Sequence, residues 1–181
     1  MKTKLITLLV SLAAFVAPQL KAADIDTDAA AFTKLANGII AQTVAGKLDV
    51  PAVRKDVEAM EKLAADFAVK YKAKYPKGGV LVDFMLAKKD SLTAMSLADI
   101  DGQFESEAIN KAHGKELGFD LTNEENEHFG NVVDLFVHPA TGLICAELWA
   151  KDAKPEHLKR IQSELQEVTE HCRHVVEKLK K

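Results

Sequence analysis

Side chains that bind metals or carry protons recur on one face of an otherwise apolar stretch, residues 121–151. Thr122 followed by Glu125 fits a capping box, which predicts a helix that starts near residue 123. From Val132 onward this helix is apolar around most of its circumference, so it should lie centrally in the core. The polar exceptions are spaced alternately four and three residues apart and therefore share one face. They are Glu127, Asn131, Asp134, His138, Thr141 and Cys145.

The last segment of the chain, residues 155–180, carries the groups that this polar row would meet. If the two segments form an antiparallel hairpin with its turn near residue 153, positions at equal distance from the turn face each other. Asp134 is then level with Cys172, and His138 lies within one turn of His171. Carboxylate, imidazole and thiol groups at one level are suitable ligands for a transition metal. The hypothesis is a metal site with His138 and Asp134 as primary groups and His171 and Cys172 as supporting ones.

Two other metal centres of helical bundles fit the spacing less well. Di-iron bundles use a Glu-x-x-His motif on each of two helices. This chain has one such motif, Glu125-x-x-His128, which adds His128 to the candidate ligands but argues against a di-iron centre. No Cys-x-x-Cys-His motif occurs, so covalently attached haem is excluded. A non-covalent haem held by Met60 and His171 stays open.

A structural interpretation competes with the metal site. Asp134 and His138 also fit an ordinary ion pair, four residues apart, on the solvent face of a helix, and such pairs are the commoner case. Pro139 and Gly142 interrupt the same helix. Because Pro139 cannot donate to the carbonyl of Leu135, we expect a kink or break there. Helix irregularities are frequent at functional sites, so the kink marks the place where a ligand would bind.

The sequence shows no catalytic apparatus, so we expect a protein that is not an enzyme. His171 and Cys172 are neighbours in the sequence, but consecutive residues do not face each other on a helix. No Gly-x-Ser-x-Gly motif and no glycine-rich phosphate loop occur. The two cysteines are expected as unpaired thiols. In a helical hairpin Cys145 and Cys172 lie about 16 Å apart along the axis, whereas a disulfide needs Cα atoms within about 7 Å.

Apolar residues at helical spacing predict an all-α, four-helix-bundle-like fold. The main helices are expected over 26–47, 51–75, 123–151 and 155–180, with a long, partly helical crossover between the second and the third. Asp49 with Pro51, and Pro155, are typical first residues of helices. Ser96 is expected to cap a short helix inside the crossover. Predicted core residues are Phe32, Ile39, Met60, Phe67, Phe136, Ile144, Trp149, Leu165 and Val175.

The N-terminus fits a secretory signal peptide, residues 1–22, cleaved after Ala22. Lys2 and Lys4 precede the apolar run 5–17, and cleavage would leave residues 23–181 as a single all-α domain, soluble in the periplasm. The full chain has a formal net charge of −3, and loss of the signal's lysines makes it more negative. This charge argues against nucleic acid as a partner. Asp134 and His138 interrupt the longest later apolar segment, so we expect no stable membrane insertion after cleavage.

These observations favour a non-enzymatic periplasmic binding or sensing protein with a transition-metal or non-covalent haem site near Pro139. The alternative is a protein–protein interaction or scaffold protein of the periplasm that has no small ligand. A homodimer or another protein partner stays open. The sequence also leaves open whether the row containing Asp134 and His138 faces solvent or the last helix.

Overall fold

The computed structural model describes residues 22–181, and every secondary-structure element in that range is a helix. The predicted all-α class is confirmed. The predicted signal peptide, residues 1–22, lies outside the described residues apart from Ala22. The four long helices are α1 (Ala22–Val44), α2 (Val50–Lys74), α6 (Gly130–Asp152) and α7 (Pro155–Lys180).

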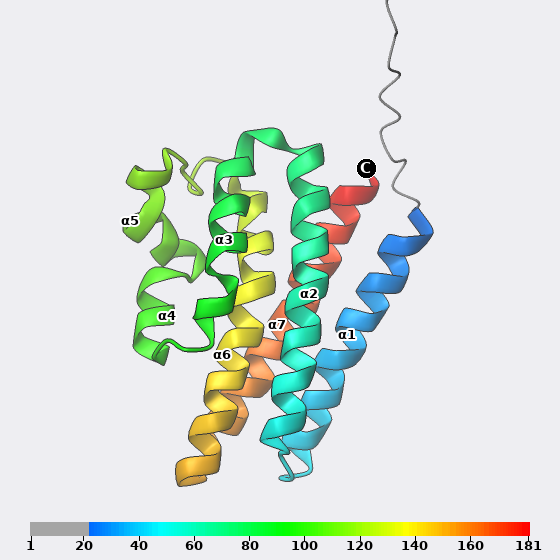
Figure 1. The fold of residues 1–181 in the computed structure, drawn as a ribbon, viewed down its shortest axis with the longest axis vertical. Helices are drawn as coiled ribbons and strands as arrows, with labels where there is room; N and C mark the ends of the chain where they lie inside the picture. The colour runs from blue at the N-terminus through cyan, green and yellow to red at the C-terminus, as the bar shows by residue number, and fades with distance from the viewer. Residues whose placement is uncertain (1–21) are drawn as a thin grey trace, which may run out of the picture.

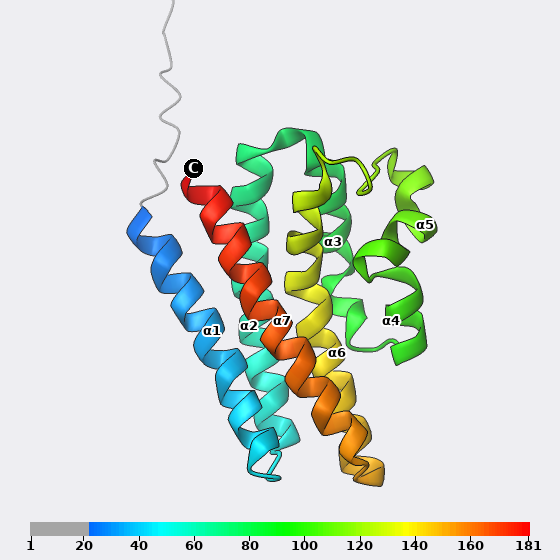
Figure 2. The ribbon, with the colours of Figure 1, turned by 180° about the vertical axis from the view of Figure 1, so that it is seen from behind.

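The four long helices form an antiparallel bundle (Figure 1). Helices α1 and α6 each pack on α2 and α7, and α2 and α7 also contact each other across the bundle. The chain direction alternates between neighbours, and the C-terminus lies beside the beginning of α1 in both views (Figures 1 and 2). The largest contact in the molecule is between α6 and α7, the two helices of the predicted hairpin.

The crossover between the second and third long helices is helical, as predicted. It comprises a 3₁₀ turn at Pro76–Gly78, then α3 (Gly79–Leu92), α4 (Leu97–Gln103) and α5 (Ser106–Leu117), and a second 3₁₀ turn at Glu127–Phe129. Helices α3, α4 and α5 contact α6 on the side away from α1 (Figure 1). The central helix α6 is therefore covered by the bundle on one side and by the crossover on the other.

Three of the predicted helix starts are confirmed. The Asp49 side chain accepts a hydrogen bond from the backbone N–H of Ala52 at 3.2 Å. Ser96 Oγ accepts from the N–H of Asp99 at 3.1 Å, which caps α4. Pro155 is the first residue of α7. The Asp49 and Ser96 side chains satisfy N–H donors that have no partner within the first turn of a helix. Proline suits this turn for a different reason, because it has no backbone N–H to satisfy.

The predicted capping box is wrong, and α6 begins later than residue 123. The Thr122 hydroxyl donates to Asp120 Oδ1 at 2.8 Å. The Glu125 N–H donates to Asn123 Oδ1 at 2.9 Å. These local bonds stabilise consecutive turns rather than a helix, because short polar side chains compete with the helical pattern. A 3₁₀ turn follows at Glu127–Phe129, and α6 begins at Gly130.

The sequence predicts a kink or break at Pro139, and the break does not occur. Helix α6 continues through Pro139 and Gly142, and both residues are buried. A Cβ atom added at Gly142 would meet Leu165 of α7 at 3.6 Å, an ordinary contact. Neighbouring helices cover α6 on several sides, and this packing holds the helix together where proline removes a backbone donor.

The core is built from the long helices together with residues of the crossover, such as Met85 and Ile100. Eight of the nine predicted core residues are buried. Phe32, Met60, Phe136 and Leu165 are each 0 % exposed. The exception is Trp149, near the end of α6, which is only partly buried. The apolar spacing therefore identified the inner faces of the helices, and the error falls where α6 leaves the bundle.

One helical segment of the described chain, Glu127–Asp152, is long and apolar enough to cross a membrane by length and composition alone, and its most apolar 18-residue window has a mean hydropathy of 1.3. The expectation that Asp134 and His138 make this segment too polar to qualify is wrong. Some 78 % of its most apolar window is buried inside the structure, so its apolar side chains are covered by other helices.

Candidate metal centre

The α6–α7 hairpin turns the polar row of α6 toward α7. The hairpin is closed by Ala153, whose left-handed backbone (φ 54°) ends α6 and whose N–H donates to the Trp149 carbonyl at 2.7 Å. Pro155 starts α7 directly afterwards. Across the hairpin, Asp134 Oδ2 lies 3.6 Å from Nε2 of His171. The question that the sequence left open is thus resolved, because the row faces the last helix.

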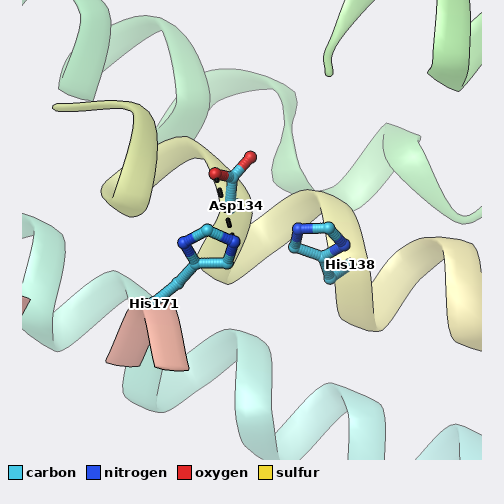
Figure 3. Close-up of side chains that lie close together, drawn as sticks. All are labelled: Asp134, His138 and His171. Atoms are coloured by element: carbon cyan, nitrogen blue, oxygen red, sulfur yellow. Dashed lines mark ion pairs between the residues drawn. The ribbon is translucent and has the colours of Figure 1, made fainter. Parts of the chain in front are cut away.

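Asp134, His138 and His171 form a group that we call the ligand cluster (Figure 3). One potential ligand atom from each residue lies within 4.8 Å of the other two. The two imidazole rings stack almost in parallel, with centroids 5.1 Å apart and an interplanar angle of 8°. In this view Asp134 and His138 extend from α6 and His171 from α7, and Asp134 lies above the His171 ring. The ligand cluster combines two nitrogen donors with one carboxylate.

The His171 ring is held by Asn131. Nδ1 of His171 donates to Asn131 Oδ1 at 2.8 Å. The amide group of Asn131 is in turn oriented by its Nδ2, which donates to the carbonyl of His128 at 3.4 Å. With the proton on Nδ1, Nε2 of neutral His171 carries a lone pair, and this atom faces the Asp134 carboxyl.

The His138 ring is held in the same way by Glu164. Nδ1 of His138 donates to Glu164 Oε2 at 2.5 Å. The other oxygen of Glu164 accepts from Nε of Arg160 at 3.1 Å, and Arg160 also binds Asp101 of α4. Nε2 of His138 is the nitrogen that remains for a ligand. A carboxylate that binds the far nitrogen of a metal-binding histidine fixes the ring and makes the near nitrogen more basic.

Burial shifts the pKa values in the ligand cluster strongly. Asp134 is 7 % exposed, and burial raises its pKa to about 7, against the smaller opposing effect of His138. Burial and the charge of His138 lower the pKa of His171 to about 4. Burial also acts to lower the pKa of His138, but the hydrogen bond to Glu164 and the charge of Asp134 outweigh it, and the pKa is raised. Between about pH 4 and 7, Asp134 and His171 are therefore mostly uncharged.

The two other candidate ligands lie elsewhere. Cys172 is 1 % exposed and turns toward α1, where it lines an open groove of about 920 Å³ between α1 and α7. His128 lies in the 3₁₀ turn before α6, and its Nδ1 bonds to the hydroxyl of Tyr71 at 2.7 Å. Among the described residues, the ligand cluster consists of the other three candidates. The sequence places Asp134 level with Cys172, whereas the structure places it beside His171. The predicted register of the hairpin is therefore wrong by one residue.

Asn131 and Glu164 were missed as positioning residues. Asn131 belongs to the predicted polar row but has no predicted role there, and no pattern in the sequence singles out Glu164. The Glu164 side chain is only 12 % exposed. The signal that could have found it is the hairpin register, which places residue 164 about one turn from the position that faces His138. Both cysteines are free, as predicted.

Comparison of the chain with protein-family models, with curated proteins and with solved structures gives no match. The function is therefore argued from the chemistry of the site.

Proposed function

We propose that the chain is a non-enzymatic periplasmic protein that binds one divalent transition-metal ion at Asp134, His138 and His171. One observation carries this proposal. Each histidine has its Nδ1 held by a neighbour, Asn131 or Glu164, and each has its Nε2 left for a ligand beside a buried carboxyl group. Two imidazoles and one carboxylate are the protein ligands of many iron and zinc sites. The periplasmic location rests on the signal-like sequence of the N-terminus.

The ligand cluster is poorly suited to be only an ion pair. The 3.6 Å between Asp134 Oδ2 and His171 Nε2 is longer than a hydrogen bond. The pKa of Asp134 lies above that of His171, so in most molecules near neutral pH His171 is uncharged and the pair carries no attraction of opposite charges. No lysine or arginine among the described residues forms an ion pair with Asp134. A divalent cation would supply the positive charge that this buried carboxyl group lacks.

The donor atoms indicate which ions would bind. Imidazole and carboxylate suit Zn²⁺, Fe²⁺, Co²⁺ and Mn²⁺, whereas Cu⁺ prefers sulfur. Cys145 and Cys172 are both buried, and burial raises their thiol pKa values to about 11 and about 12. Protonated, buried thiols are poor ligands and poor nucleophiles, which supports both the choice of ion and a non-enzymatic role. A single ion with ligands at about 2.1 Å requires the stacked rings to turn toward one point.

The test is to measure metal content and Zn²⁺ affinity. The mature chain, purified from a periplasm without chelator or affinity tag, should contain close to one metal ion per chain by elemental analysis. After removal of the metal, titration calorimetry with Zn²⁺ should show one site, and His138→Gln or His171→Gln should weaken it at least 100-fold. The matched control is His157→Gln, because His157 also pairs with an aspartate, Asp152, at 3.2 Å but outside the bundle core. Equal Zn²⁺ affinity in the wild type and the two cluster variants would refute the proposal.

The alternative function, an interaction or scaffold protein without a small ligand, makes a different prediction. It requires self-association or a stable protein partner, and light scattering of the purified chain measures the first of these. A metal-free chain that forms a dimer would favour this alternative over the metal site.

A further inference from the structure

Helices α6 and α7 carry the same arrangement of polar residues around the ligand cluster. In α6 the sequence runs Asn131-x₂-Asp134-x₃-His138. In α7 it runs Glu164-x₂-Glu167-x₃-His171. Residues at these spacings lie on one face of a helix. Each helix thus presents, in the same order, a hydrogen-bonding residue, a carboxylate and a histidine.

The contacts across the hairpin follow the same correspondence. Asn131 of α6 accepts from Nδ1 of His171, and Glu164 of α7 accepts from Nδ1 of His138. The two histidine rings between them are nearly parallel, at an angle of 8°. The first residue of each set therefore binds the histidine of the other helix. Antiparallel helices with reciprocal contacts are related by a local two-fold axis, here between the two rings.

This local symmetry gives Asp134 an equivalent in Glu167. Asp134 lies close to the histidine of the other helix, His171, so Glu167 is expected beside His138. In agreement, the negative charge of Glu167 acts to raise the pKa values of all three cluster residues. Its side chain is exposed, and Ser163 Oγ donates to its Oε1 at 2.7 Å. No lysine or arginine of the described chain forms an ion pair with it.

We propose that Glu167 is a fourth metal ligand, which makes the site a two-histidine, two-carboxylate centre at the edge of the α6–α7 hairpin. This inference rests on the proposed function. Two carboxylates and two neutral imidazoles balance the charge of a divalent ion, whereas Asp134 alone would leave one positive charge in a largely buried site. The ligand set therefore selects divalent ions such as Zn²⁺, Fe²⁺ or Mn²⁺ over Cu⁺. Glutamate has one more methylene than aspartate and can reach the ion from the solvent side.

Glu167→Gln tests the proposal against a matched control, Glu170→Gln. Both substitutions remove one exposed negative charge from α7, but Glu170 already binds Arg173 and does not belong to the repeated arrangement. Competition with a chromophoric chelator would measure the Zn²⁺ affinity of the wild type and of both variants. We expect Glu167→Gln to weaken binding by about 10- to 100-fold and Glu170→Gln by less than twofold. Co²⁺ bound to Glu167→Gln should also show an altered visible absorption spectrum.

The salt dependence of Zn²⁺ affinity shows whether Glu167 coordinates the ion or only attracts it through space. An exposed charge that acts only through space is screened at high salt, so its effect on affinity should largely vanish near 1 M NaCl. A coordinating carboxylate keeps its effect there. Wild type that binds no Zn²⁺ would refute the proposed function itself. Wild type that binds Zn²⁺ while Glu167→Gln behaves like Glu170→Gln, or a Glu167→Gln effect that vanishes at high salt, would leave the three-residue site intact and refute Glu167 as the fourth ligand.

Discussion

Two histidines of the molecule, His128 and His171, have much in common locally but very different surroundings. Burial lowers the pKa of both, and both have Nδ1 in a short hydrogen bond. His171 faces the carboxyl group of Asp134 across the α6–α7 hairpin. His128 instead lies among aromatic rings, with centroids of Tyr71, Tyr75 and Phe129 at 5.6, 5.0 and 4.3 Å.

The comparison shows that the neighbours of a histidine, rather than its burial, indicate whether it could bind a metal. The aromatic cluster of Tyr71, Tyr75, His128 and Phe129 connects the end of α2 to the 3₁₀ turn before α6 through ring contacts and the hydrogen bond between Tyr71 and His128. Besides burial, the positive charge of Lys178 lowers the pKa of His128. The same charge opposes the approach of a metal cation. The ligand cluster combines a carboxyl group with two oriented imidazoles. We therefore expect the aromatic cluster to determine stability and the ligand cluster to determine metal affinity.

The largest expected effect belongs to the aromatic cluster. Phe129 is 2 % exposed and contacts Tyr71 and Phe119 edge to face, each at 5.5 Å between centroids. Phe129→Ala should lower the free energy of unfolding by about 3–5 kcal/mol, since it leaves a cavity in a packed site. Urea denaturation measures this loss. Zn²⁺ affinity should stay within twofold of the wild type, and a large loss of affinity would show that the two regions are not independent.

The control for Phe129→Ala is Val69→Ala on α2. Val69 is 57 % exposed, so its truncation should change stability by less than about 0.5 kcal/mol. A comparable loss in both variants would mean that the method reports a general sensitivity of the fold rather than the aromatic cluster.

The next effect is stabilisation by metal. Free Zn²⁺ at 100 times its dissociation constant should stabilise the wild type by about 2.7 kcal/mol, because it binds the folded state only. His171→Gln should show almost none of this stabilisation at the same Zn²⁺ concentration, whereas Phe129→Ala should retain it in full. Denaturation with and without Zn²⁺ measures the difference. Stabilisation of His171→Gln equal to that of the wild type would place the Zn²⁺ site elsewhere.

Most of the fold could be predicted because apolar spacing and helix starts agree with each other. Asp49, Ser96 and Pro155 begin helices where the sequence indicates. The start of α6 could not be predicted, since Thr122 and Glu125 fit a capping box and also fit the local turns that the structure adopts. The choice between the two depends on tertiary packing, in which Phe129 lies against Gly78.

The candidate site could be predicted in part. Counting from the turn of the hairpin identifies the level at which Asp134, His138 and His171 meet. It does not give the rotation of α7 about its axis, and a rotation of one residue, or about 100°, exchanges His171 for Cys172. The hairpin register places Glu164 about one turn from the position that faces His138, but it does not show that the side chain turns toward the histidine. A glutamate on an amphipathic helix is usually solvated, and only the packed hairpin shows that this one binds His138.

The pH dependence of stability gives a smaller effect with opposite signs for two residues. The pKa of Asp134 is raised on folding. Its stabilising contribution to the free energy of unfolding is therefore complete below about pH 4 and is lost as the pH rises through about 7. The pKa of His171 is lowered, so its contribution is present above about pH 6.5 and is lost as the pH falls through about 4. Between these limits the two contributions largely cancel in the metal-free wild type.

Single substitutions should remove this cancellation. As the pH rises from 5 to 7.5, the stability of Asp134→Asn should increase by about 2 kcal/mol relative to that of the wild type, because only the wild type loses the contribution of Asp134. His171→Gln should gain stability, relative to the wild type, as the pH falls from 6.5 to 4. Urea denaturation in the presence of chelator measures both differences. Glu61, whose pKa is raised to about 7 by burial, titrates in every variant and cancels in the comparison. Parallel pH profiles for wild type and both variants would contradict the assigned shifts.

The smallest effect concerns the point at which the two regions meet, the backbone carbonyl of His128. This carbonyl accepts from the Tyr71 hydroxyl at 3.5 Å and from Asn131 Nδ2 at 3.4 Å. Tyr71→Phe removes the hydroxyl and its 2.7 Å bond to His128 Nδ1, and should cost about 1 kcal/mol of stability. Because both hydrogen bonds to the carbonyl are long, loss of the Tyr71 hydroxyl should hardly change the position of Asn131. Zn²⁺ affinity should therefore change less than twofold.

Tyr75→Phe is the matched control for Tyr71→Phe. The hydroxyl of Tyr75 donates to the Lys178 carbonyl at 2.9 Å near the surface. The Tyr75→Phe variant should therefore lose less stability than Tyr71→Phe and no Zn²⁺ affinity. A loss of Zn²⁺ affinity in Tyr71→Phe alone would mean that Tyr71 positions His171 through His128 and Asn131. The aromatic cluster would then be part of the metal site, because the orientation of one ligand would depend on the packing at the start of α6.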